Sequence, residues 1–91
     1  MTPAAACFVY LVRCRDGTYY CGVARDVERR VAQHNRGRGA RYTRSRGPVV
    51  LVYWEPAASW ADALKRERAV KAWSHDRKEA LAATWKNHGD G

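Results

Sequence analysis

The residues most able to do chemistry in this 91-residue chain are five polar side chains at positions that the hydrophobic pattern directs inward. They are Tyr10, Tyr20, Arg30, His34 and Glu67. Tyrosine and histidine can exchange protons, arginine binds anions through paired donors, and a carboxylate can hold a hard cation. Common enzyme signatures are missing, because the chain has no phosphate-binding P-loop, nucleotide-binding glycine fingerprint or Ser/His/Asp spacing.

Two runs rich in β-forming residues, 8–14 and 18–24, are separated by a short turn that ends in Gly17. This pattern predicts a β-hairpin. The length of its turn decides what the hairpin presents. A two-residue loop would place Tyr10 and Tyr20 on opposite faces of the sheet.

A three-residue loop, with Gly17 in the left-handed position of a G1 bulge, gives a different register. It pairs Val12 with Tyr20 and Tyr10 with Gly22, so that both tyrosines lie on one face. We favour this register because Gly22, which has no side chain, then leaves space beside the Tyr10 hydroxyl.

Asp26 is a good N-cap for a helix that runs to about Asn35 and ends at the stretch 37–39. One face of this helix carries Val27, Arg30, Val31 and His34 at helical spacing. The two valines mark the face as inward, so Arg30 and His34 point toward the sheet. Burying them without partners would cost roughly several kcal/mol, so we expect a compensating site.

The next segment, residues 36–47, is expected to be a basic loop around Tyr42. Residues 48–54 form a continuous apolar run, which predicts a third strand closed by Glu55 and Pro56.

Two helices are expected in the C-terminal part. Ser59 opens the first, which runs to about Trp73, and Ser74 caps the second, which runs to about Trp85 and precedes a polar tail. The predicted inward positions of the first helix are Trp60, Ala63, Leu64, Glu67 and Lys71. Those of the second are Leu81, Ala82 and Trp85. A carboxylate, Glu67, is thus expected on a core-facing surface.

The net charge of +8 is concentrated in one stretch. Residues 13–46 contain ten arginines against three acidic residues, a net of +7. Guanidinium groups suit two-point contact with phosphate, although a base-composition bias in the genome would also favour arginine over lysine. A local basic surface is typical of nucleic-acid binding, although many charge runs are only solvated faces.

Composition also bounds the class of protein. The length predicts a single domain over residues 1–91, with its core at about 7–85. Three cysteines, Cys7, Cys14 and Cys21, give neither a disulfide framework nor a CxxC metal site, and we interpret them as reduced core residues. Neither a membrane span nor a signal peptide is indicated, so we expect a cytoplasmic protein.

Four motifs occur in order along the chain and resemble those of one known family. Phe8-Val9-Tyr10 stands where that family has a GIY triplet, and Tyr20-Cys21-Gly22 stands for YIG. Residues 26–34 are similar to its helix with Arg30 four positions before His34, and residues 63–67 are similar to its segment with a metal-binding glutamate. The sequence therefore resembles the GIY-YIG nucleases, most closely their small stand-alone bacterial (YhbQ-like) members. It departs from the motif at Phe8 and Cys21, which are backbone or packing positions.

The resemblance implies an α+β fold, with a central three-stranded antiparallel sheet flanked by helices. It also implies hydrolysis of phosphodiester bonds, with DNA as the expected partner and repair or turnover as the expected setting. Glu67 would hold Mg²⁺ or Mn²⁺, Arg30 would contact phosphate oxygens, and Tyr10 would act as base or proton relay. Tyr20 and His34 would orient water and phosphate. The expected nucleic-acid contacts are Arg36, Arg38, Arg41, Tyr42, Arg44 and Arg46.

Other interpretations stay open at this point. The chain could be a nucleic-acid-binding module with the same fold and no cutting activity, or a basic adaptor for a partner nuclease. The tyrosines could be structural, Arg30 and Glu67 could form a buried salt bridge, and His34 could cap its own helix. Lys71, one turn after Glu67, is expected to be its ion-pair partner.

Overall fold

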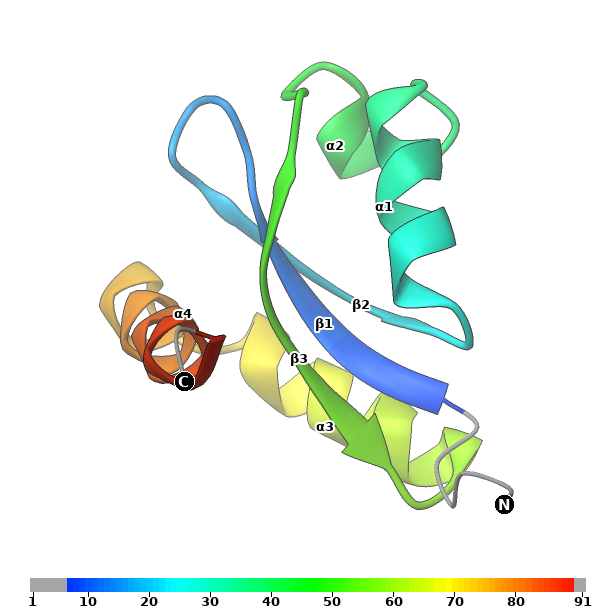
Figure 1. The fold of residues 1–91 in the computed structure, drawn as a ribbon, viewed down its shortest axis with the longest axis vertical. Coiled ribbons are helices and arrows are strands. Elements are labelled where there is room, and N and C mark those ends of the chain that lie inside the picture. Colours follow the sequence, from blue (N-terminus) through cyan, green and yellow to red (C-terminus); the bar gives the residue numbers. More distant parts are fainter. Residues whose placement is uncertain (1–6, 90–91) are drawn as a thin grey trace.

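A three-stranded antiparallel sheet lies at the centre of the computed structural model, which describes residues 7–89 (Figure 1). The remaining ends of the predicted domain lie outside the described residues. The strands are β1 (Cys7–Arg13), β2 (Tyr19–Ala24) and β3 (Val50–Ala57), in the order β2-β1-β3. The helices are α1 (Val27–Asn35), α2 (Arg41–Arg44), α3 (Trp60–Lys71) and α4 (His75–Gly89). The predicted α+β class is confirmed.

The hairpin between β1 and β2 has the three-residue loop that the sequence favoured. The Cys14 amide donates to the Thr18 carbonyl oxygen at 2.7 Å, and Gly17 takes a φ of 87°. Tyr10 pairs with Gly22, and Val12 pairs with Tyr20. Residues directly opposite in a sheet share a face, so both tyrosines lie on the same side.

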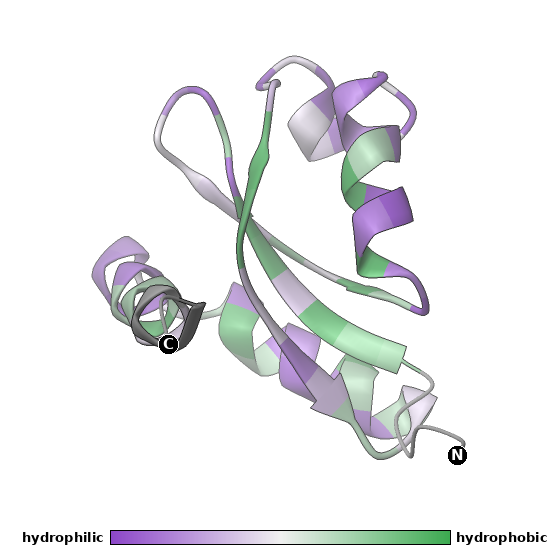
Figure 2. Ribbon diagram, in the orientation of Figure 1, coloured by the Kyte–Doolittle hydropathy of each residue, from purple (hydrophilic) through white to green (hydrophobic). Residues whose placement is uncertain are grey.

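Alternate residues of β1 feed two hydrophobic clusters, one on each face of the sheet, and β1 is accordingly apolar over most of its length (Figure 2). Val9 and Leu11 belong to the cluster that packs against α3 and α4. Tyr10 and Val12 belong to the cluster beneath α1. The period of two along the strand therefore separates the chemistry-bearing face from a purely packing face.

Two boundaries differ from the predicted ones. β3 begins at Val50 and continues through Glu55 and Pro56, which were expected to end it. Proline is tolerated there because β3 is an edge strand and needs no outward amide donor. The expected basic loop contains the short helix α2. Ala40, which precedes this helix, has an extended conformation.

The prediction for the helices on the face of the sheet opposite α1 was also partly wrong. Ala63 and Val70 are the buried residues of α3, whereas Trp60 and Leu64, predicted to face inward, are 40% and 36% exposed. The helix is therefore rotated so that its small residues meet the sheet, which lets the backbone approach closely. α4 is longer than predicted and ends at Gly89, with Ala82 buried. Among the described residues, no helix has the length and apolar character that crossing a membrane requires.

Candidate active site beneath helix α1

A chain of buried polar groups lies between β1, α1 and α2. The Tyr10 hydroxyl lies 2.7 Å from His34 Nε2, and His34 Nδ1 lies 2.7 Å from the Thr43 hydroxyl. All three residues are almost fully buried, with Tyr10 at 1%, His34 at 2% and Thr43 at 0% exposure. His34 therefore does not cap the end of its helix, which was one open interpretation. Its ring connects the sheet to α2.

Two glycines make room for this chain. A Cβ atom on Gly22 would lie 2.5 Å from the Tyr10 hydroxyl oxygen, and one on Gly39 would overlap His34 Nδ1. The first glycine had been predicted to leave space beside Tyr10. The role of Gly39 was missed, because the loop that carries it folds back onto α1 in a way that no local pattern encodes.

Burial sets the protonation states of the two ionisable groups. It raises the pKa of Tyr10 to about 12, although the nearby Arg30 guanidinium acts in the opposite direction. It lowers the pKa of His34 to about 4, with the charge of Arg30 contributing in the same direction. His34 is therefore neutral and Tyr10 protonated near pH 7 when no further cation is present.

Arg30 lies at the rim of the chain and is partly exposed. Its Nη1 donates to the Gln33 side-chain oxygen at 3.1 Å. A buried ion pair between Arg30 and Glu67, the structural alternative for both residues, is not formed: among the described residues Glu67 pairs with Lys71 instead. The guanidinium thus keeps donors available beside the Tyr10 hydroxyl.

Tyr20 connects the buried chain to the surface. Its ring meets His34 edge-on at 5.4 Å and stacks on Tyr42 at 5.9 Å. The Lys71 ammonium lies 5.1 Å from the centre of the same ring. Tyr42, singled out from the sequence as a candidate contact, is 37% exposed and extends this aromatic surface toward α2.

Glu67 approaches from the opposite side of the sheet. It belongs to α3, and its side chain is 18% exposed. Its Oε2 lies 3.4 Å from Lys71 Nζ, so the predicted pair between them is confirmed. Lys71 in turn reaches the Tyr20 ring, which places Glu67 at the open edge of β2, the outer strand on this side. Lys71 therefore connects the glutamate to Tyr20, and through that ring to the other predicted site residues.

The basic segment divides into two kinds of arginine. Four are exposed with no ion pair among the described residues: Arg36, Arg38, Arg41 and Arg44. Arg46 is engaged, because its Nε lies 3.3 Å from an Asp16 carboxylate oxygen and its guanidinium covers the Tyr42 ring at 4.0 Å. The first four are available for phosphate, whereas Arg46 holds α2 against the hairpin loop.

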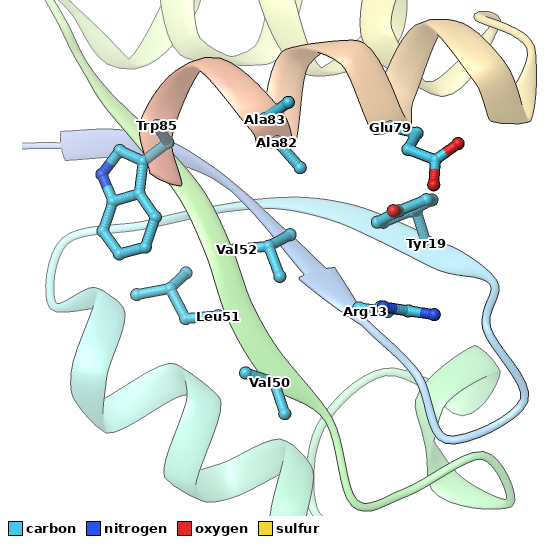
Figure 3. Close-up of a pocket in the computed structure, with 9 residues that line it drawn as sticks. All are labelled: Arg13, Tyr19, Val50, Leu51, Val52, Glu79, Ala82, Ala83 and Trp85. Carbon is cyan, nitrogen blue, oxygen red and sulfur yellow. The ribbon is translucent and has the colours of Figure 1, made fainter. Parts of the chain in front are cut away.

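Two other features lie away from these residues. A cavity of about 470 Å³ opens between α4 and β3, with Val52 and Trp85 in its lining and none of the predicted site residues (Figure 3). Within the described chain, one group of three possible metal ligands gathers, formed by His75, Asp76 and Glu79. All three are exposed on α4, and Glu67 is not among them.

Comparison with known proteins gives the arrangement its class. The model of the GIY-YIG catalytic domain matches residues 6–80, and the chain belongs to this family of endonucleases. A UPF0213 protein of Halobacterium salinarum is 52% identical over 73 residues, which cover 80% of this chain and 95% of that protein. A UPF0213 protein of Staphylococcus saprophyticus is 46% identical over 74 residues, covering 81% and 90%.

A solved structure supports the same relationship. The solution NMR structure of the UPF0213 protein BH0048 from Bacillus halodurans is 41% identical to this chain, with a TM-score of 0.54. The match covers 86% of this chain and 83% of that one. The three-stranded sheet with flanking helices is therefore shared with a small bacterial relative, as the motifs indicated.

Proposed function

We propose that this protein is a metal-dependent nuclease that hydrolyses phosphodiester bonds of DNA. The observation that carries the proposal is the buried Tyr10–His34 pair beside a partly exposed arginine, at the edge of a strongly basic surface. A tyrosine hydroxyl, a guanidinium and a nearby carboxylate are the groups that phosphodiester hydrolysis calls for. We further propose that the protein acts in the cytoplasm, in DNA repair or turnover.

The residues divide the work as follows. Tyr10 exchanges a proton with the attacking water, which requires its raised pKa to fall as a divalent cation enters the site. Arg30 contacts the non-bridging phosphate oxygens, where negative charge grows in the transition state. Tyr20 and His34 position the water and Tyr10, and the exposed arginines of residues 36–44 hold the flanking phosphates.

Glu67 suits a divalent cation. It is a largely buried carboxylate, 18% exposed, whose oxygen pairs with the Lys71 ammonium at 3.4 Å. One carboxylate with water and phosphate oxygens is a common arrangement for Mg²⁺, and Mn²⁺ takes similar ligands. When bound, the metal would neutralise charge on the leaving oxygen. We propose Glu67 as its protein ligand.

One observation favours a second candidate, a nucleic-acid-binding module that does not cut. Lys71 neutralises Glu67, and a neutralised carboxylate would not repel phosphate on a basic surface. The two candidates predict different behaviour for the same variant, Glu67→Gln.

The test is cleavage of labelled single-stranded, flap and duplex DNA, and of RNA, with and without Mg²⁺ or Mn²⁺. We expect wild-type protein to cut at least one substrate only when metal is present. Glu67→Gln should lose cleavage by orders of magnitude, should fold, and should bind DNA as tightly as wild type or more tightly. Glu79→Gln, which removes an exposed carboxylate of the α4 group, is the matched control and should cut normally. A wild type that cuts nothing, or a Glu67→Gln variant that cuts normally, would establish the binding module instead.

A further inference from the structure

The Nδ1 atom of His34 faces two donors. The Thr43 hydroxyl lies 2.7 Å from it, and the Ala40 backbone N–H donates to it at 3.3 Å. The same hydroxyl lies 3.0 Å from the Ala40 carbonyl oxygen, which also accepts the Thr43 backbone N–H at 3.1 Å, so the one hydroxyl hydrogen can go either to that oxygen or to Nδ1. The position of a single proton on the imidazole decides which of these contacts are favourable.

If Nδ1 carried the proton, its N–H would donate to the Thr43 hydroxyl. The Ala40 N–H would then meet another N–H end to end at 3.3 Å, which is repulsive and leaves a backbone donor unmatched. If Nε2 carries the proton, the Nδ1 lone pair accepts from both Ala40 and Thr43. Both donors then point at the one lone pair of Nδ1, with the shorter contact, 2.7 Å, made by the Thr43 hydroxyl. The second arrangement therefore gives an acceptor to both the Ala40 N–H and the Thr43 hydroxyl.

We infer that Thr43 and the Ala40 amide hold His34 in the Nε2–H form, so that His34 donates a hydrogen bond to the Tyr10 oxygen. Thr43 is therefore a positioning residue that acts on Tyr10 through His34. No role for Thr43 was expected from the sequence. Gly39 contributes by letting the backbone reach the ring, since any Cβ there would overlap Nδ1.

This tautomer changes the part that His34 plays. A histidine that donates to Tyr10 cannot also take the Tyr10 proton, so water that enters with the substrate must accept that proton. The resulting phenolate then accepts from His34 Nε2–H, with the Arg30 guanidinium nearby, and can remove a proton from the attacking water, which restores the hydroxyl. His34 stays neutral throughout, in agreement with a pKa lowered by burial to about 4.

The direct test is NMR of the imidazole nitrogens in ¹⁵N-histidine-labelled wild-type protein at pH 7. We expect His34 to show a protonated Nε2 and an unprotonated Nδ1. A proton on Nδ1 would overturn the inference. Only the cleavage measurements below rest on the proposed function. If the protein cuts nothing, this spectrum still decides which tautomer His34 adopts.

Two variants test the role of Thr43. Thr43→Val keeps the shape but removes the hydroxyl, and we expect a mixture of His34 tautomers with cleavage reduced about 10- to 100-fold, as when other partners that orient a functional histidine are removed. Thr43→Ser keeps the hydroxyl and should preserve the tautomer, with most of the activity. A Thr43→Val protein with the wild-type tautomer and rate would overturn the assignment. If that variant does not fold, Thr43→Ser decides, because loss of the Nε2–H form with the hydroxyl present would contradict the inference.

Discussion

The two faces of the sheet are built from alternate residues of β1, yet they bury different chemistry. Beneath α3 and α4 the buried residues are aliphatic, apart from two cysteines and Tyr19. Beneath α1 the apolar cluster encloses Tyr10 and adjoins His34 and Thr43, which are linked by hydrogen bonds. A buried polar chain is stabilising only when each member is matched, whereas apolar packing has no such condition. We therefore expect stability to depend mainly on the first face and function on the second.

Tyr10→Phe should have the largest effect on activity. It removes one oxygen from the α1 face, and a positioned proton-transfer group typically contributes about 10²- to 10⁴-fold to a rate. We expect cleavage of the best substrate to fall by that amount. The urea midpoint should fall as well, because the buried His34 Nε2–H loses its acceptor, which costs about 1–3 kcal/mol. A variant that keeps full activity would remove Tyr10 from the mechanism.

Leu11→Ala is the counterpart on the other face. Leu11 is 1% exposed, and its truncation should lower the free energy of unfolding by about 2–5 kcal/mol through lost burial and a cavity. Urea denaturation measures the loss. At a temperature where the variant remains folded, its cleavage rate should be close to wild type. A large loss of activity in the folded variant would show that the faces are not separable.

The pH dependence of stability should also distinguish the faces. Because the folded state lowers the pKa of His34 from 6.5 to about 4, the unfolded chain binds the extra proton first. Stability from this group is thus fully present above about pH 6.5 and is lost as pH falls toward 4, by up to roughly 3 kcal/mol.

Urea midpoints at pH 7 and pH 4.5 measure this effect. His34→Gln should show a smaller loss between the two values than wild type does, since the carboxylates titrate in both proteins. The same loss in both proteins would contradict the assignment of the shift to His34.

The smallest effect is expected from single surface arginines. Arg38→Ala should weaken DNA binding only a few-fold and reduce the slope of log affinity against log salt by about 0.7–0.9, if one phosphate contact is removed. Arg77→Ala, on α4 beneath the other face, is the control and should leave binding unchanged. Fluorescence anisotropy at several salt concentrations measures both. A flat salt dependence in wild type would indicate an acidic protein partner instead of nucleic acid.

The sequence correctly predicted which side chains of β1, β2 and α1 lie on the α1 face of the sheet. It did not predict how α3, on the opposite face, is placed relative to them. The hairpin register followed from a three-residue turn with Gly17, because turn geometry is local. The inward direction of His34 followed from the valines on its helix. Helical spacing says which residues share a side of α3, but not which side of the sheet that helix covers or how it is rotated. The place of Glu67 at the β2 edge could not be predicted for that reason.

The contact of Thr43 with His34 was beyond the sequence as well. It depends on a loop that returns through Gly39 and on a helix of only four residues, α2, which has no side-chain cap to mark its start. Such a segment carries no hydrophobic period of its own. The conformation of this segment depends on its contacts with the His34 ring.

The three cysteines offer a way to follow motions of the molecule. All are buried with free thiols, Cys14 within the α1 cluster and Cys7 and Cys21 within the α3 cluster. Burial raises the pKa of both Cys14 and Cys21, the latter to about 12, so neither reacts while it stays enclosed. The rate of thiol labelling therefore measures how often each half of the protein opens. A protein that retains only Cys14 would report breathing of the half with the polar chain, and one that retains only Cys7 would report breathing of the other.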